Sequence, residues 1–373
     1  MTLLRTARGA ADRTPLLIGL LGLTLGGVYF ASIDLRDPAF SFGLHERIIA
    51  GEAGSPYRYR VLVPMLLESL TRAFALLEPR DAAFLHASGV YDCLGLVVQL
   101  LALYALARQW FSPVQSLVGV AFTSGVTLAT FSYFTYQPWS ILEVTFFSLG
   151  FLFAYHGYWR GVGIMVVLAS LNRETGIFLP LALLLGSTEA RHPFDLAALR
   201  RALVRREPRL AFGFVVLSAG IFAGLRLLRG SAAQVDALGD VFIRNLQPDN
   251  LAAAAMVVTL FLGLGWIFAA YGWARAPHFV GGVGRVVPLY LAAFAVWGWW
   301  REVRILTTLY PIVMPLVLSY CYRSRTRPVD GTDQQAPEAA HRSVQLADLA
   351  SDRFGAADQP HGPRRRRCCP SGP

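Results

Sequence analysis

The fold is decided by Pro15–Ile33, PLLIGLLGLTLGGVYFASI, and by the polar segment that follows it, Asp34–Pro64, DLRDPAFSFGLHERIIAGEAGSPYRYRVLVP. Pro15–Ile33 carries no charge and approaches the length of about 20 residues that a helix needs to cross a bilayer. Arginines precede it at positions 5, 8 and 13. Basic residues favour the cytoplasmic side of a span. A cleavable signal peptide has a shorter apolar core, so we expect an uncleaved span with Asp34–Pro64 on the outer side.

The composition of the whole chain agrees with this interpretation. Of its 373 residues, 54% are hydrophobic and only 16% are charged, whereas soluble proteins carry about 25% charged residues. All 34 basic residues are arginine. They gather in short segments between apolar runs and in the tail, where they act as topology signals, so the net charge of +10 does not indicate nucleic-acid binding. The four cysteines have neither a disulfide framework nor metal-ligand spacing.

Further apolar runs predict an all-α fold, a polytopic transmembrane helix bundle of about 8–10 spans. The runs after the first are Ala83–Ala107, Val114–Phe134, Trp139–Trp159, Gly161–Gly186, Ala211–Leu228, Leu251–Trp273, Val286–Trp300 and Ile305–Tyr322. We expect one bundle over residues 1–322, which includes an outer loop at 34–82. The Arg-rich remainder, 323–373, is predicted to be a disordered cytoplasmic tail.

One segment of the outer loop, Val61–Leu77, is only marginally long enough to span. It carries Glu68 and Arg72 in its middle, and each charge would cost about 2.5–3.5 kcal/mol at the centre of a membrane helix. One apolar stripe runs along it, formed by Leu62, Leu66, Leu70 and Phe74. This pattern favours an amphipathic helix that lies in the membrane interface.

A second segment, Gly161–Gly186, is interrupted by the polar residues Asn172–Thr175. The Arg-rich stretch Arg191–Arg209 must be cytoplasmic, which leaves two topologies. In the first, Val61–Leu77 lies on the outer surface and Gly161–Gly186 enters the membrane and returns as a broken, re-entrant helix. In the second, both segments cross fully. The first is favoured because it keeps charged pairs out of full spans.

Several polar groups are expected to converge at the outer side. They are Asp34, Asp37, Tyr57, Arg58, Arg60, Arg173, Glu174, Glu302 and Arg304. Arginine at the outer ends of spans runs against the positive-inside bias, so an anionic partner is expected. The planar guanidinium binds phosphate oxygens in a bidentate manner, and a lipid phosphate or diphosphate is therefore the natural candidate. An aspartate beside it would take a proton or hold a divalent cation.

Structural roles for the same residues stay open. Asp34 and Asp37 suit helix capping, and Arg58 and Arg60 suit anchoring of an interfacial helix beside aromatic-belt tyrosines. The Arg173–Glu174 and Glu302–Arg304 segments suit ion pairs inside the bundle. Glu143 needs a partner because it falls in an apolar run, and His45 suits a surface position.

With these residues in place, the chain resembles the polytopic glycosyltransferases of the GT-C type. The resemblance rests on Asp37 followed by Gly51–Tyr57 (GEAGSPY), on Val166–Arg173 (VVLASLNR) and on Arg301–Arg304 (REVR). The chain departs from the family pattern because it lacks an Asp-x-Asp pair in the first outer loop and a large soluble domain after the last span.

The resemblance implies transfer of a sugar from a polyprenyl-phosphate donor to an envelope glycan or lipid acceptor at the outer face of a bacterial plasma membrane. Both termini would be cytoplasmic. Asp37, with Asp34 as the second candidate, would be the catalytic base, and Arg58, Arg60 and Arg304 would hold the phosphate. The only cofactor it allows is a divalent cation, and the sequence indicates no metal-ligand set. The alternative is a non-catalytic lipid-phosphate-binding, transport or assembly protein.

Overall fold

The computed structural model describes residues 13–128, 130, 136–188, 196–230, 238–300 and 302–322. Every regular secondary-structure element in these ranges is a helix, so the predicted all-α class is confirmed. All of these residues belong to one compact unit. The predicted cytoplasmic tail, from residue 323 on, lies outside the described residues.

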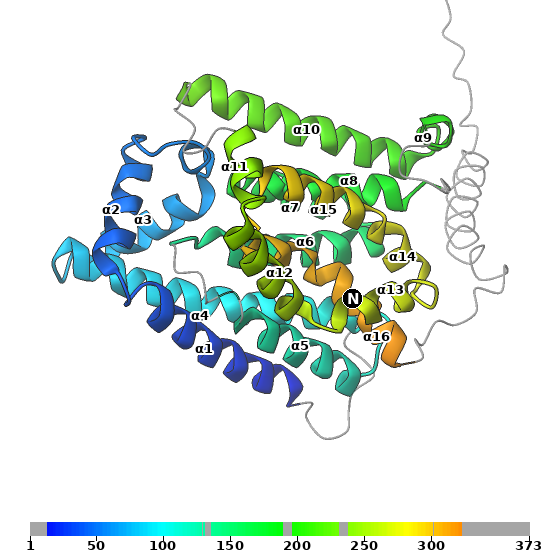
Figure 1. Cartoon of the computed structure of the whole chain (residues 1–373), viewed down its shortest axis with the longest axis horizontal. Coiled ribbons are helices and arrows are strands. Elements are labelled where there is room, and N and C mark those ends of the chain that lie inside the picture. The colour runs from blue at the N-terminus through cyan, green and yellow to red at the C-terminus, as the bar shows by residue number, and fades with distance from the viewer. Residues whose placement is uncertain are drawn as a thin grey trace, which may run out of the picture. The chain divides into compact units, whose positions relative to one another are not determined.

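Within the described part, five helical segments are long and apolar enough to cross a membrane, which indicates an integral membrane protein (Figure 1). They are α1 (Thr14–Ile33), α4 (Arg80–Ala107), α10 (Arg206–Arg229), α14 with α15 (His278–Trp297), and η4 with α16 (Val303–Cys321). Four shorter apolar helices accompany them: α5 (Pro113–Leu128), α6 (Trp139–Tyr155), α7 (Trp159–Asn172) and η3 with α8 (Glu174–Gly186). Of the bundle predicted from about 8–10 apolar runs, the described residues therefore contain five segments of spanning length and four shorter apolar helices.

One predicted span is divided. The run Leu251–Trp273 forms two helices, α12 (Pro248–Leu262) and α13 (Gly265–Trp273). Gly263 separates them with a φ of 51°, a left-handed conformation that glycine adopts without the steric penalty of a side chain. Two short helices, α9 (Leu196–Ala202) and α11 (Leu238–Asn245), complete the described elements of the second half.

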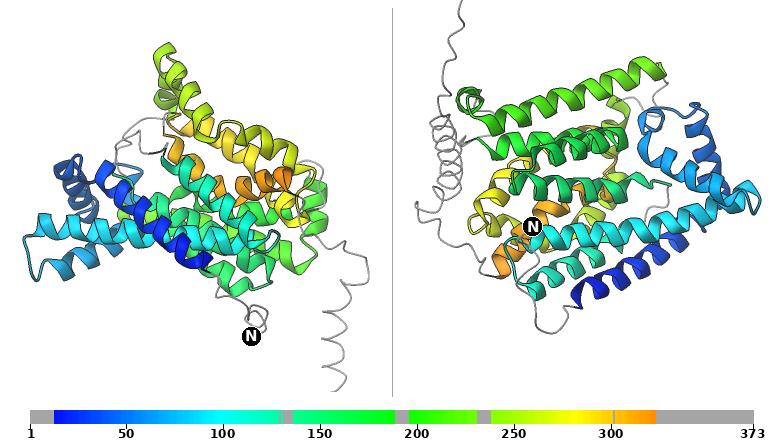
Figure 2. Two further views of the ribbon diagram at one scale, coloured as in Figure 1. Left: turned by 90° about the horizontal axis from the view of Figure 1, so that it is seen from below. Right: turned by 180° about the vertical axis from the view of Figure 1, so that it is seen from behind.

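The first span packs tightly against α4, as both views of Figure 2 show. A Cβ atom added at Gly22 would lie 2.7 Å from the Val97 Cα, and one at Gly26 would lie 2.5 Å from the Cys93 Cα. Small residues four positions apart let the backbones of two membrane helices approach closely. The Gly22–Gly26 spacing therefore fixes where α1 lies along α4.

The N-terminal part of α4 extends beyond what a bilayer requires. Its 28 residues span about 42 Å at 1.5 Å per residue, against a hydrocarbon core of about 30 Å. Two helices pack beside it there, α2 (Pro38–Ile49) and α3 (Leu62–Phe74), at the left in Figure 1. The segment predicted to be an interfacial helix forms the helix α3, and Leu66 in its apolar stripe is 43% exposed. We call this the α2–α3 end.

The predicted break in Gly161–Gly186 is also found. The turn η3 folds back so closely on α7 that a Cβ at Gly176 would lie 2.5 Å from the Ala169 carbonyl. The Val61 N–H donates to the Leu171 carbonyl at 3.0 Å, which places the tip of the hairpin at the α2–α3 end. Arg285 donates to the Thr188 carbonyl at 2.6 Å at its other end. Both arms pack on α10, so the segment forms a helical hairpin.

Candidate functional site

Three buried arginines meet at the α2–α3 end, and each is paired with a glutamate. Arg60 lies 3.1 Å from Glu174, Arg173 lies 3.2 Å from Glu143, and Arg304 lies 2.6 Å from Glu302. The structure thus brings together five of the predicted site residues, Arg60, Arg173, Glu174, Glu302 and Arg304. It also gives Glu143 the partner that its apolar surroundings require. Arg301, the neighbour of Glu302, lies outside the described residues.

The pairs form one electrostatic network. Burial acts to raise the pKa of Glu302, but the positive charges of Arg304 and Arg173 outweigh it, and the pKa is lowered. The Gln137 amide also donates to Glu302, and the Thr175 hydroxyl donates to Glu143. The network ties the start of α6, the tip of the hairpin and η4 together.

Aromatic rings enclose the first of these arginines. The Arg60 guanidinium carbon lies 4.6 Å from the centroid of the Trp139 ring and 5.3 Å from that of Tyr57. The Tyr57 and Trp139 rings lie 5.6 Å apart. Guanidinium groups at such distances are attracted by the ring faces. Arg60 is therefore held by an acid and two rings, and Tyr57 packs on Trp139.

The remaining predicted arginine, Arg58, lies in a different environment. Arg229 donates to the Arg58 carbonyl at 2.8 Å, and the Arg226 guanidinium carbon lies 5.8 Å from the centroid of the Tyr59 ring. The Tyr59 hydroxyl donates to the Gly230 carbonyl at 3.0 Å, which joins the end of α10 to η1 (Tyr57–Tyr59). We call Arg58, Arg226 and Arg229 the arginine patch. Within the described ranges, none of the three forms an ion pair with an acidic residue.

Sequence analysis missed two members of this patch. Arg226 and Arg229 stand in the last turn of α10, at the end of that span opposite Arg191–Arg209. The signal was available, because arginine at the outer end of a span opposes the positive-inside bias. The sequence could not show that Arg58 and Arg229 are neighbours, because they are 171 positions apart.

Asp37 both caps a helix and lines a cavity. Its Oδ1 atom accepts from the Phe40 N–H at 3.1 Å, which caps the N-terminus of α2. The same side chain is exposed and lines a cavity of about 370 Å³. The other lining residues are Ile33, Arg36, Phe40, Ser41 and Tyr136. The capping role and the site role predicted for Asp37 are therefore compatible in this geometry.

Asp34, the second predicted catalytic acid, is placed differently. It is 3% exposed at the C-terminal end of α1, and it does not line the cavity. Burial raises the pKa of Asp34 to about 6, and hydrogen bonds with Asp92 and Ser41 partly oppose this rise. Asp92, on α4, was not identified from the sequence because its neighbour Asp34 is far away in the chain. The two acids form a buried carboxyl pair.

His45 is fully buried, so the prediction of a surface histidine is wrong. Its Nε2 atom lies 3.3 Å from Glu68 Oε2, and its Nδ1 atom lies 3.3 Å from the Tyr136 hydroxyl. Burial lowers the pKa of His45, against the opposing effect of Glu68. The imidazole also packs on the Phe84 ring with centroids 4.9 Å apart. The sequence could not show this site because Phe84 and Tyr136 come from distant segments.

Three potential ligand atoms for a metal ion, from His45, Glu46 and Glu68, lie within 4.8 Å of one another. However, Arg80 donates to Glu46 at 2.8 Å and to Glu68 at 3.0 Å. Arg72 also donates to Glu68, at 2.6 Å. Because a guanidinium already neutralises both carboxylates, the donor set suits an ion-pair cluster better than a metal ion.

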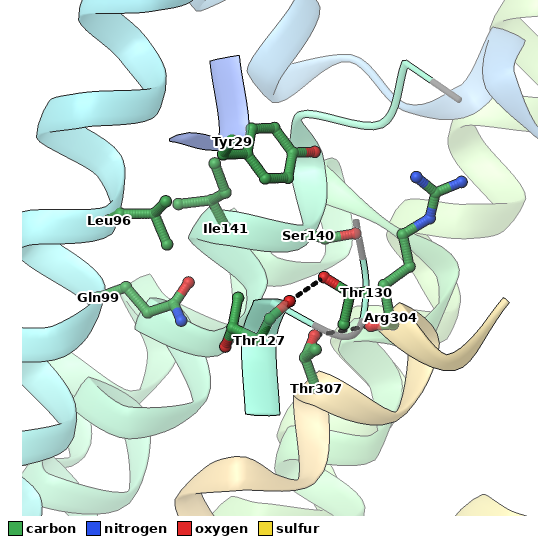
Figure 3. Close-up of a pocket in the computed structure, with 9 residues that line it drawn as sticks. All are labelled: Tyr29, Leu96, Gln99, Thr127, Thr130, Ser140, Ile141, Arg304 and Thr307. Carbon is green, nitrogen blue, oxygen red and sulfur yellow. Dashed lines mark hydrogen bonds between the residues drawn. The ribbon is translucent and has the colours of Figure 1, made fainter. Parts of the chain in front are cut away.

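Beside Arg304 lies a small pocket (Figure 3). Its volume of about 20 Å³ is enough for one water molecule. The pocket is lined by Tyr29, Leu96, Gln99, Thr127, Thr130, Ser140, Ile141, Arg304 and Thr307. It is too small for a sugar or a lipid head group, and it is separate from the cavity beside Asp37.

Comparisons with protein-family models, with curated proteins and with solved structures found no match. The fold and the site therefore have to be interpreted from this chain alone.

Proposed function

We propose that this integral membrane protein transfers a sugar from a polyprenyl-phosphate donor to an envelope glycan or lipid acceptor at its α2–α3 end. The observation that carries the proposal is the cavity at the end of α1, in which the Asp37 carboxylate and the Arg36 side chain line the same space. The cavity thus brings together a carboxylate that can accept a proton and a positively charged guanidinium group. The resemblance to GT-C-type glycosyltransferases implies both groups at this end of the bundle.

The chemistry of the cavity suits a sugar. Asp37, Arg36, Ser41 and Tyr136 offer polar groups for sugar hydroxyls, and Phe40 offers an apolar surface for the C–H face of the ring. Its volume of about 370 Å³ falls within the range of about 300–1,000 Å³ typical of small-molecule sites. Asp37 is solvent-exposed, so an acceptor can reach its carboxylate.

The arginine patch is the best-supported place for the donor phosphate. Arg60, Arg173 and Arg304 are each neutralised by a glutamate, and an anion would have to compete with these buried pairs. Arg229 instead donates to the backbone carbonyl of Arg58, and Arg226 lies over the ring of Tyr59, so three arginines gather around η1 without a neighbouring glutamate among the described residues. Guanidinium groups bind phosphate oxygens through bidentate hydrogen bonds.

A row of rings leads from the patch to the cavity. Tyr57, next to Arg58, lies 5.6 Å from Trp139, and Trp139 lies 6.1 Å from Tyr136, which lines the cavity. In a donor the phosphorus and the anomeric carbon are joined through one oxygen, so the phosphate would lie at the edge of the cavity nearest Tyr57, between the sugar and the arginine patch. In this arrangement Arg60 and Arg304 do not bind the donor. Arg60 holds the Trp139 ring in place, and Arg304 holds the start of η4.

The proposed step has a simple balance of atoms. Asp37 takes the proton from the acceptor hydroxyl, and the oxygen attacks the anomeric carbon with inversion of configuration. The bond between that carbon and the phosphate oxygen breaks, and the polyprenyl phosphate leaves with the negative charge. The arginine patch stabilises that charge.

The orientation proposed for the chain follows the arginine distribution. Arg191–Arg209 would lie in the cytoplasm with both termini, and the α2–α3 end would face outward. In a bacterial cell this places the cavity at the outer face of the plasma membrane, where lipid-linked sugars serve envelope assembly.

The proposal is tested by donor turnover. The full chain in lipid nanodiscs would be given undecaprenyl-phosphate-glucose and related donors with a membrane-glycan extract. Release of undecaprenyl phosphate would be measured. We expect the double variant R58Q/R229Q to raise the KM for the donor about tenfold or more, because each charge-assisted hydrogen bond contributes about 1.5–3 kcal/mol. R206Q, at the other end of α10, is the matched control and should behave as the wild type. Equal KM values for all three proteins would contradict the phosphate assignment.

A non-catalytic lipid-phosphate binder is the second candidate function. It is favoured by the arginine patch, which needs no catalytic base to bind an anionic lipid. Binding of undecaprenyl phosphate that depends on Arg58 and Arg229, without any turnover of the donor panel, would support this candidate against the transferase.

A further inference from the structure

We infer that Glu68, His45 and Tyr136 form a hydrogen-bond relay that makes the Tyr136 hydroxyl an acceptor toward the cavity, so that Tyr136 selects a ligand hydroxyl there. The inference deepens the proposed function and rests on it for the identity of the ligand. The relay itself is a property of this chain that can be tested without any turnover. None of the three residues was predicted from the sequence to belong to a functional site.

The relay begins at an anchored carboxylate. Glu68 is buried, and it accepts hydrogen bonds from Arg72 at 2.6 Å and from Arg80 at 3.0 Å. These two guanidinium groups keep Glu68 ionised, since a charge-assisted hydrogen bond favours the charged form. An ionised carboxylate can only accept. The proton between Glu68 and His45 therefore belongs to His45 Nε2.

The next step fixes the other ring nitrogen. His45 is completely enclosed, with Phe84 at 4.9 Å and the Tyr136 ring at 6.4 Å, measured between ring centroids. Burial favours the neutral imidazole, and a neutral ring with a proton on Nε2 has an acceptor at Nδ1. The Tyr136 hydroxyl, 3.3 Å from Nδ1, must then be the donor.

The last step concerns the cavity. Because the Tyr136 proton is committed to His45, the lone pairs of its oxygen remain for a ligand. Tyr136 lines the cavity with Asp37 and Ser41. A bound group that donates a hydrogen bond, such as a sugar hydroxyl, is accepted there. A group that can only accept is disfavoured, because it would face a lone pair.

Other charged groups surround the relay and bear on its pH dependence. Glu46 and Arg80 act on His45 in addition to Glu68. Asp34 and Asp92 act on Tyr136 from the side of α1 and α4. Protonation of His45 would place a proton on Nδ1 and reverse the relay, so that Tyr136 would present a donor to the cavity. Because burial lowers the pKa of His45, this reversal is expected below the ordinary range for histidine.

The first arm of the test measures the tautomer. Nitrogen-15 NMR of the histidine rings would be recorded on the full chain in nanodiscs at pH 7, with H45Q to assign the His45 signals. We expect Nε2 to be protonated and Nδ1 unprotonated, and we expect Y136F to shift the Nδ1 signal. Y59F is the matched control, because Tyr59 donates to a backbone carbonyl instead. A His45 protonated on Nδ1 at pH 7, or an Nδ1 signal unchanged in Y136F, would overturn the relay.

The second arm measures the consequence in the cavity. Y136F keeps the ring and removes the hydroxyl. Because it leaves the buried Nδ1 atom of His45 without its donor, we expect the unfolding temperature to fall moderately. Turnover of the folded protein should fall about tenfold. Unchanged kcat and KM in Y136F would overturn the role of the relay and leave the transferase standing. No turnover in the wild type, with the expected NMR result, would overturn the transferase and leave the relay standing.

Discussion

The Arg173 Nη1 atom lies 3.2 Å from the Glu143 Oε2 atom, and the two side chains are only 4% and 0% exposed. This pair joins the tip of the α7–α8 hairpin to α6. Loss of one partner leaves the other charge buried and unpaired, which typically costs about 3–5 kcal/mol. We expect R173A and E143A to lower the thermal unfolding temperature strongly, as measured in detergent.

The control for this prediction is Arg72, whose side chain is 71% exposed in its pair with Glu68. Exposed ion pairs contribute about 0–1 kcal/mol, so R72A should change the unfolding temperature little. The double variant R173A/E143A should be destabilised by less than the sum of its single variants. Additive effects would show that the two charges do not interact.

Two adjacent glycines in α1 offer a matched test of helix packing. A Cβ at Gly26 would lie 2.5 Å from the Cys93 Cα, whereas a Cβ at Gly27 would meet nothing within 4 Å. G26A should therefore force α1 away from α4 at a cost of about 1–3 kcal/mol. G27A should be neutral or slightly stabilising, because alanine favours the helix. Equal unfolding temperatures for the two variants would contradict the contact between α1 and α4.

The buried carboxyl of Asp34 gives stability a pH dependence whose sign can be stated. Burial raises its pKa from 3.8 to about 6 in the folded chain. Below about pH 4, where the unfolded chain also holds the proton, its contribution is fully present, and it is lost as the pH rises through about 6. D34N cannot ionise, so it should be more stable than the wild type at pH 7. Its stability should also lack the decrease with rising pH that Asp34 causes. The unfolding temperatures of the wild type and D34N would be compared at pH 4.5 and pH 7. An equal change in both proteins between the two pH values would contradict this assignment.

The orientation can be tested by cysteine labelling. In a background without the native cysteines, a cysteine at Gln109 is expected to face the cytoplasm and one at Glu52 the outside. A membrane-impermeant maleimide should label E52C in intact spheroplasts and Q109C only after lysis. A cysteine at Arg206 is the control for the inner side. Labelling of Q109C in intact cells would favour the topology in which Val61–Leu77 and Gly161–Gly186 both cross fully.

Sequence patterns were sufficient where the signal is local. The apolar runs located the apolar helices, five of them long enough to span a membrane, and the charged pair Glu68–Arg72 and the polar residues Asn172–Thr175 marked α3 and the broken helix. The division of Leu251–Trp273 into two helices was missed. A glycine such as Gly263 within an apolar run does not reveal from the sequence that its φ is positive. Local patterns therefore gave the elements but not every break.

Contacts between residues on different helices of the bundle could not be predicted from the sequence. It indicated that Arg60, Arg173 and Arg304 converge, but it could not show that each has its own glutamate, because Arg60 and Glu174 are 114 positions apart. For the same reason it did not group Arg58 with Arg229, or His45 with Tyr136. These pairings depend on tertiary packing, and they decide which arginines remain for a phosphate.

The central claim is that Asp37 accepts a proton, and its capping role makes a direct test possible. Asparagine and serine cap helices about as well as aspartate, whereas alanine costs about 0.5–2 kcal/mol. Donor turnover and thermal stability would be measured together for D37N, D37S and D37A, with E52Q as an exposed acidic control in the same loop. The transferase account predicts that D37N and D37S keep the stability of the wild type and lose turnover by about 100-fold or more. Full turnover in D37N and D37S, with a loss of stability only in D37A, would show that Asp37 is a helix cap alone and would contradict the account.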